Sequence, residues 1–475
     1  MAKNFKIIVF ILILGLSIFL RLWKYPFYPF VGHAEEYLFV WSGLSLIEKG
    51  VPISWNDLPV YQEKHIYWQG VAPNPAGGSG LGVRLLKPWL DEPPLFSLIV
   101  GGMAKLYNQP NFHLISSYVV RLPSLFFSFL SLILVFILAK RLFSFEIGLL
   151  SLLIYGTMPT VVFGSRLAVP ENLIVPLFLS SLILILGYLN DGRKWKRDLS
   201  FVFSVLAAFA KPTGLLLVPL LASFLFCQKK LKEGFWAGFL SIFFFFILYF
   251  SYGFYYDKDL FLKVFLYQAQ RPAGWSGLAF LITNPGFSVE VFLDSFLVLG
   301  FFALGYLLFK NRDKGEDTLL FSFIFSLLMV VISGGKHDQL AWYRYPIYPF
   351  MAIAIALLVR EIYRKPTFFA SAIFIPLFIS NADLLENPFW RLKFFIESRF
   401  YRLSFAIFLL PSIFQFFFKG KIWLKLSRIV IVIAFILGIF LNVWVVKSRF
   451  NLLCDNTVCP LPQKIDLLKP AIFGE

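Results

Sequence analysis

Apolar runs of membrane-spanning length recur along almost the whole chain, and they constrain its fold more than any other feature. The first run covers residues 5–22, and roughly 20 apolar residues are enough to cross the hydrocarbon core of a bilayer. Hydrophobic residues make up 59% of the 475 residues and charged residues only 15%. A soluble domain carries about 25% charged residues. We therefore predict an all-α, polytopic integral membrane protein.

The apolar runs predict about 13 transmembrane helices, or 11 if the shortest runs, several of them under 18 residues, do not span. The runs are 5–22, 122–138, 147–163, 173–189, 201–210, 215–226, 235–252, 291–309, 319–332, 347–359, 368–379, 405–418 and 429–446. No polar stretch between them is long enough to bury a core of its own. We therefore expect residues 1–475 to form one integral-membrane unit.

The basic residues lie between the apolar runs rather than in one patch, so the net charge of +17 indicates a membrane protein and not a nucleic-acid partner. Lys3 and Lys6 precede the first run and predict a cytoplasmic N-terminus. No small-residue cleavage site follows this run, so we expect a membrane anchor and not a signal peptide. The predicted extracytoplasmic segments are then 25–94, 253–290, 334–346, 381–402 and the tail 447–475.

The first outer stretch, residues 25–94, carries two pairs of adjacent carboxylates. Glu35-Glu36 comes about a dozen residues after the first span, and Asp91-Glu92 closes the stretch directly before Pro93-Pro94. Apolar spacing over 34–49 and 93–106 predicts two amphipathic helices at the membrane surface. The glycine-rich segment 77–82 lacks the strand and helix that a phosphate-binding loop needs, so a flexible loop is the favoured interpretation. Acid pairs beside a membrane indicate a site at the bilayer surface.

Six short motifs follow one another in a fixed relation to the predicted spans. They are Gly32-His33-Ala34-Glu35-Glu36, Asp91-Glu92-Pro93-Pro94-Leu95, Arg121-Leu122-Pro123-Ser124, Ser165-Arg166 with Val169-Pro170-Glu171-Asn172, Ala210-Lys211-Pro212-Thr213-Gly214, and Tyr343-Arg344-Tyr345-Pro346. In this order they resemble the GT-C membrane glycosyltransferases, in particular the branch of dolichyl-phosphate-mannose–protein mannosyltransferases and aminoarabinose–lipid A transferases. The resemblance is closest over residues 20–220. It implies a catalytic module over 1–227, with additional membrane helices over 228–475.

The resemblance implies that a sugar moves, with inversion, from a polyisoprenyl-phosphate donor to a lipid, protein or glycan acceptor at the outer face of the cell membrane. It gives Glu35 the place of the base that deprotonates the acceptor, with Glu36 and Asp91 as further catalytic candidates. The family shows Asp where Glu35 stands, and often a basic residue where Glu92 stands. Such chemistry needs one carboxylate as base and cations on the departing phosphate. The expected cations are Arg166, Lys211 and Arg344, and the expected substrate-binding residues are Glu92, Glu171 and Tyr345.

Each of these residues also has a plain structural interpretation. The acids could cap helix starts, and Arg166, Lys211 and Arg344 could anchor their spans at the interface. His33 and His337 could bind a divalent metal with Glu36 or Asp338, although their spacing does not favour it, and no other cofactor is expected. Cys454 and Cys459 are expected to form a disulfide outside the membrane, and Cys227 to be an inert apolar residue.

Two other functions remain open at this point. An outer-face polysaccharide polymerase or ligase usually has its key loop late in the chain, not after the first span. A transporter or flippase places charges within its spans and shows paired repeats. Here the acids lie in predicted loops and no internal repeat is visible, so the glycosyltransferase interpretation is favoured.

Overall fold

The computed structural model of the chain describes residues 3–29, 34–56, 58–67, 84–112, 115–271, 277–279, 281, 294–334, 341–382, 398–418 and 420–454. Within these residues the regular structure is almost entirely helical. The sheet found there is one antiparallel pair, β1 (Ser54–Trp55) and β2 (Leu85–Leu86). The prediction of an all-α membrane protein is confirmed.

Within the described residues, every predicted apolar run overlaps a helix, and the run 147–163 is divided between two helices. The N-terminal part contains α1 (Lys3–Leu22), α2 (Ala34–Lys49), η1 (Glu63–His65), α3 (Leu95–Leu106), α4 (Ser117–Val120), α5 (Leu122–Leu142), α6 (Phe145–Thr157), α7 (Pro159–Gly164), α8 (Glu171–Asp191), α9 (Lys194–Ala210), η2 (Pro212–Leu216) and α10 (Leu217–Cys227). The remainder contains α11 (Leu231–Ala269), α13 (Ser295–Phe309), α14 (Lys314–Ser333), η3 (Ala341–Ile347), α15 (Tyr348–Arg364), α16 (Phe368–Ile379), η4 (Ser380–Ala382), α18 (Ser398–Phe418) and α19 (Lys421–Cys454).

Seven helical segments of the described chain are long and apolar enough to cross a bilayer. They are Asn4–Leu22, Ser117–Leu142, Glu171–Asp191, Leu231–Ala269, Lys314–Ser333, Ala341–Arg364 and Lys421–Ser448. Six further apolar helices have between 10 and 17 residues. Some helix lengths differ from those of the predicted runs. The runs 319–332 and 347–359 lie within segments of 20 and 24 residues, and the run 291–309 overlaps a helix of 15 residues.

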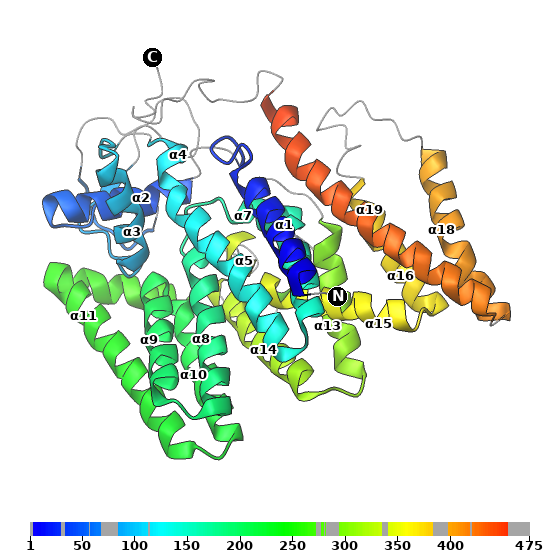
Figure 1. Cartoon of the computed structure of the whole chain (residues 1–475). Coiled ribbons are helices and arrows are strands. Elements are labelled where there is room, and N and C mark those ends of the chain that lie inside the picture. Colours follow the sequence, from blue (N-terminus) through cyan, green and yellow to red (C-terminus); the bar gives the residue numbers. More distant parts are fainter. Residues whose placement is uncertain are drawn as a thin grey trace.

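The two helices of the first outer stretch, α2 and α3, form where they were expected and lie together at one end of the helix bundle (Figure 1). Their backbones touch where they cross. A Cβ added at Gly43 would lie 1.7 Å from the carbonyl oxygen of Ser97, and one added at Gly101 would lie 2.4 Å from the carbonyl carbon of Gly43. Most side chains of α2 between Glu36 and Ser45 are buried, so this helix is packed into the protein. The close crossing fixes Glu35 relative to the turn that precedes α3.

Helix α11 bends sharply at Asp257, whose backbone is extended (φ −165°, ψ 102°). The Oδ1 atom of Asp257 accepts from the Leu260 N–H at 2.9 Å and so caps the second half of the helix. The first half runs along the bundle, and the second half lies across it below α2 and α3 (Figure 1). Two contacts hold the bend to the first outer stretch: His65 Nε2 lies 3.3 Å from Asp257 Oδ2, and the Tyr256 hydroxyl donates to Gly50 O at 3.0 Å.

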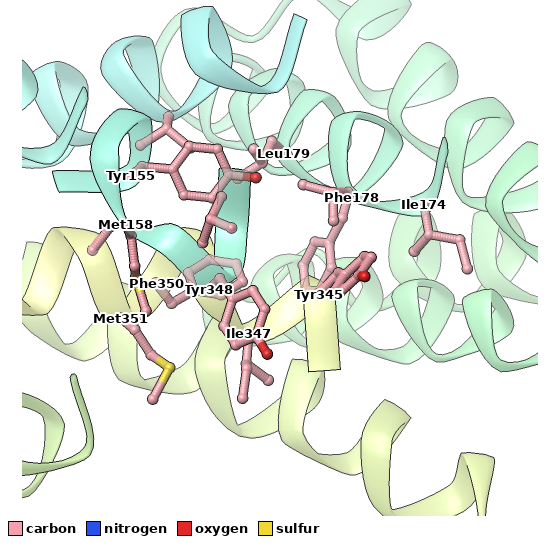
Figure 2. Close-up of a cluster of buried hydrophobic side chains, with 14 of the residues drawn as sticks. Tyr155, Met158, Ile174, Phe178, Leu179, Tyr345, Ile347, Tyr348, Phe350 and Met351 are labelled. Carbon is pink, nitrogen blue, oxygen red and sulfur yellow. The ribbon is translucent and has the colours of Figure 1, made fainter. Parts of the chain in front are cut away.

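A buried cluster joins the N-terminal helices to η3 and α15. Figure 2 shows Tyr155, Met158 and Phe178 on one side of it and Tyr345, Tyr348 and Met351 on the other. These side chains are at most 5% exposed. The cluster fixes η3, which begins with Ala341, against α8, so the first residues of η3 are held beside the first outer stretch.

Candidate active site

A small polar cavity lies where α2, the turn before α3, the end of α9, the end of α11 and η3 meet. Its volume is about 130 Å³. Its charged lining residues are Glu35, Asp91, Glu92, Lys211 and Arg271. The uncharged lining residues are Leu38, Phe39, Trp55, Asn56, Trp89, Pro170, Gln268, Trp342 and Tyr343. The predicted acid pairs at 35–36 and 91–92 are therefore brought together, with Glu35, Asp91 and Glu92 facing one space.

A second, mainly apolar cavity of about 460 Å³ adjoins the first. Both halves of the bent α11 line it, together with η2, α10 and the end of α14. The two cavities share Asp91, Glu92, Lys211, Gln268 and Arg271. Polar and charged groups therefore stand at the junction of a polar chamber and an apolar one.

The three carboxyl groups of the polar cavity lie in a poorly solvated place. Burial raises the pKa of Glu35 to about 7, against the opposing effect of the Lys211 charge. Burial likewise raises the pKa of Asp91 to about 7 and that of Glu92 to about 8. Tyr61 donates to Asp91 Oδ1, while Asp91 Oδ2 has no hydrogen-bond partner among the described residues. Carboxyl groups with a pKa near 7 exchange protons readily at neutral pH.

Lys211 stands at the break between α9 and η2, where its extended backbone (φ −160°, ψ 139°) ends the α-helix before Pro212. Its Nζ atom lies 2.6 Å from Glu171 Oε1 and 3.7 Å from the centre of the Tyr343 ring. Glu171 occupies the first turn of α8. The two residues that the sequence assigned to phosphate and substrate binding thus form one buried ion pair at the cavity wall.

Glu36 points away from the cavity into a buried ion pair with Arg121. Arg121 Nε and Nη2 each donate to one Glu36 oxygen at 2.9 Å, and the Ala168 N–H donates to Glu36 Oε1 at 2.9 Å. Arg121 Nη1 also donates to the carbonyls of Tyr25 at 2.8 Å and Pro29 at 2.9 Å. The Arg121 and Glu36 side chains are 0% and 4% exposed. The pair ties the start of α2 to α5, and this geometry favours a structural role for Glu36.

Three other predicted site residues do not line either cavity. Arg166 donates to the carbonyls of Tyr28 at 2.9 Å and Leu20 at 2.6 Å, which fixes the end of α1. Arg344 is buried in η3. Tyr345 packs in the cluster of Figure 2, with its ring centre 6.0 Å from that of Tyr348. Their roles in binding donor phosphate or substrate stay predictions that the contacts do not favour.

Several residues of the cavity wall were not predicted from the sequence, above all Arg271 and Gln268. They follow the bend of α11, and no local pattern marks that bend except Asp257, a helix-capping residue type inside an otherwise helical run. Trp342 and Tyr343 were also missed, although they adjoin the motif 343–346 that was singled out. Arg271 is the second cation of the site beside Lys211.

Four predicted positions fall outside what the structure describes: His33, His337, Cys459 and the side chain of Cys454. The metal and disulfide predictions therefore stay predictions. Among the described side chains, no group of three or more His, Cys, Asp or Glu could hold a metal ion. Cys227 is an exposed free thiol at the end of α10.

The fold and the site together define a multi-pass membrane protein with a charged chamber at one end of its helices and an apolar chamber beside it. Residues 91–252, about a third of the chain, match the sequence profile of the dolichyl-phosphate-mannose-protein mannosyltransferase family. No curated protein sequence matches the chain at a significant level.

Solved structures share the architecture over almost the whole chain. ArnT from Cupriavidus metallidurans bound to undecaprenyl phosphate is 14% identical with a TM-score of 0.54, over 94% of this chain and 79% of ArnT. Arabinosyltransferase EmbB from Mycobacterium smegmatis is 13% identical with a TM-score of 0.53, over 94% of this chain and 41% of EmbB. The chain therefore shares the fold of these proteins, and its residues 91–252 match the profile of the mannosyltransferase family.

Proposed function

We propose that this protein transfers a sugar from a polyisoprenyl-phosphate-linked donor to an acceptor hydroxyl or amine of a lipid, protein or glycan, at the extracytoplasmic face and with inversion. The observation that carries this proposal is the junction of the two cavities, where Lys211 and Arg271 line both. A donor of this class has an apolar chain, a phosphate and a sugar in that order. The apolar cavity, the two cations and the polar cavity follow in the same order.

The proposed reaction forms a bond between the acceptor and the anomeric carbon while the bond from that carbon to the phosphate oxygen breaks. Glu35 takes the proton that the acceptor loses. The phosphate diester carries one negative charge and leaves as a monoester with up to two, so the gain of charge occurs at the phosphate. Cations beside the phosphate therefore stabilise the transition state more than they stabilise the bound donor. This difference accelerates the step.

The burial of the three acids supports the assignment of Glu35 as base. A carboxylate with a raised pKa is a stronger base, and a pKa near the working pH gives the best compromise between basicity and ionised fraction. Glu35 begins α2 and lines the polar cavity but not the apolar one, so it faces the space assigned to the sugar. Asp91 lines both cavities and is held by Tyr61, which suits a residue that orients the donor.

The catalytic module that we propose, residues 1–227, supplies every acid of the polar cavity. The segment 228–475 adds Gln268, Arg271, Trp342 and Tyr343 to its wall. Basic residues between the spans support a cytoplasmic N-terminus, which places α2, α3 and the cavity outside. Both parts of the chain therefore contribute to one site, and we propose that they act as a unit.

The proposal is tested with purified protein in lipid nanodiscs and a set of synthetic undecaprenyl-phosphate sugars. We expect transfer of one of these sugars to an acceptor from cell-envelope extract. Arg271→Gln should weaken donor binding about tenfold or more, because a charge-assisted contact to phosphate is lost. Lys194→Gln, at an exposed position at the start of α9, is the matched control and should bind normally. Movement of lipid-linked sugar across vesicles without transfer would instead establish the transporter interpretation.

A further inference from the structure

A hollow separate from the site lies between α13, α15 and α16. Its volume is about 730 Å³, and it shares no lining residue with either cavity of the site. Its wall is apolar along α13 and α16, with Phe302, Phe309 and Ile373 among the side chains there. We call it the α13–α16 groove.

The groove is open along its side. Phe302 is 50% exposed and Ile373 is 46% exposed. Gly305 lines the groove, and a Cβ added to it would meet no atom within 4 Å. Both α13 and α16 are apolar helices without charged residues, so the open side faces the hydrocarbon of the bilayer. The space is therefore accessible to an acyl chain from the membrane.

Charged groups gather at one end of the groove, where α13 and α15 end and α16 begins. Lys310 Nζ lies 2.6 Å from Glu316 Oε1 and 3.7 Å from Glu361 Oε1, so these two acids already face a cation. Lys365 lines the groove, is exposed, and forms no ion pair with a described residue. The basic residues of this end are Lys310, Arg312, Lys314, Arg360, Arg364, Lys365 and Arg428. The acids are Asp313, Glu316, Asp317 and Glu361, which leaves an excess of positive charge.

We propose that the α13–α16 groove binds one anionic phospholipid, with its acyl chains along α13 and α16 and its phosphate at Lys365. Apolar contact alone does not select a lipid here, because the surrounding bilayer is equally apolar. Selection must come from the headgroup, and a basic pocket between membrane helices attracts anionic headgroups, by about fivefold for each lysine or arginine near the surface. The occupant is therefore a lipid of net negative charge, and the site is independent of the proposed transfer reaction.

The test uses the full chain exchanged into nanodiscs of equal parts phosphatidylglycerol and phosphatidylcholine, followed by native mass spectrometry of the lipids that stay bound. We expect phosphatidylglycerol to be retained in preference. Lys365→Gln should lower that preference about fivefold, whereas Lys194→Gln, on a different basic loop, should leave it unchanged.

A matched pair of glycine variants tests the location. Gly305→Leu fills the groove, and Gly15→Leu adds the same side chain to α1, where a Cβ also meets nothing within 4 Å. Both substitutions improve helix propensity, and thermal unfolding checks that both variants fold. We expect Gly305→Leu to lose the bound lipid and Gly15→Leu to keep it. Equal retention of the two lipids by the unaltered protein, or equal loss from both glycine variants, overturns the proposal.

Discussion

The adjacent acids Glu35 and Glu36 allow catalysis and stability to be separated by two single substitutions. Successive residues of an α-helix point about 100° apart, and in the structure Glu35 lines the polar cavity while Glu36 binds Arg121. We expect Glu35→Gln to abolish turnover without loss of stability. Glu36→Gln should have the opposite effect and leave a folded but less stable enzyme.

The expected magnitudes follow from the surroundings of each carboxylate. Loss of a general base lowers the rate by about 10²–10⁴, and donor binding should survive because Lys211 and Arg271 remain. Removing one partner of a buried ion pair costs about 3–5 kcal/mol. We expect the lower end for Glu36→Gln, because the glutamine oxygen still accepts one bond from Arg121, and the Tyr25 and Pro29 carbonyls accept others.

The assay compares the unaltered protein with both variants in the same nanodiscs. Turnover is measured with the active donor, donor affinity by equilibrium binding, and stability by thermal unfolding. Glu35→Asp serves as the conservative control, since it keeps a carboxylate at the position where the related family has Asp. We expect it to recover a measurable part of the activity that Glu35→Gln loses.

One pattern of results refutes the reasoning. If Glu36→Gln is stable and inactive while Glu35→Gln turns over normally, the base is Glu36 and the Arg121 pair is part of the catalytic machinery. If both variants turn over normally, the base lies elsewhere in the cavity. Asp91 is then the leading candidate, because its Oδ2 atom is buried without a hydrogen-bond partner among the described residues.

Three further measurements address the site, the packing and the topology. Because the base must be ionised and burial raises the pKa of Glu35 to about 7, the turnover rate should increase with pH through about 7 and then level off; a flat profile between about pH 5 and 9 would contradict this role. Gly43→Ala should lower the unfolding temperature clearly, because the new Cβ would lie 1.7 Å from Ser97 O; an unchanged temperature would show that α2 and α3 can separate at no cost. A membrane-impermeant thiol reagent applied to intact cells should label Glu63→Cys and not Lys194→Cys; the reverse result would invert the membrane orientation.

The architecture could be predicted from the sequence, because the signal for a membrane helix is local. The apolar runs are bounded by charged residues, and a backbone segment in lipid must satisfy its own hydrogen bonds, as an α-helix does. For the same reason α2 and α3 were predictable from spacing within single segments. The sequence also indicated the region of the candidate site, since a buried carboxylate is costly and marks a place of interest.

Which charged side chains share one space depends on how the helices pack, and no local sequence pattern shows it. Glu35 and Glu36 are adjacent in sequence, and the difference between them is the guanidinium of Arg121, 85 residues away and directly before α5. Arg166 donates hydrogen bonds to backbone carbonyls of α1 and the first loop. Arg271, which no motif marks, reaches the cavity because α11 bends at Asp257. The partner of a buried charge is the group that helix packing places beside it. Because those helices are far apart in sequence, the partner is seen only in the folded structure.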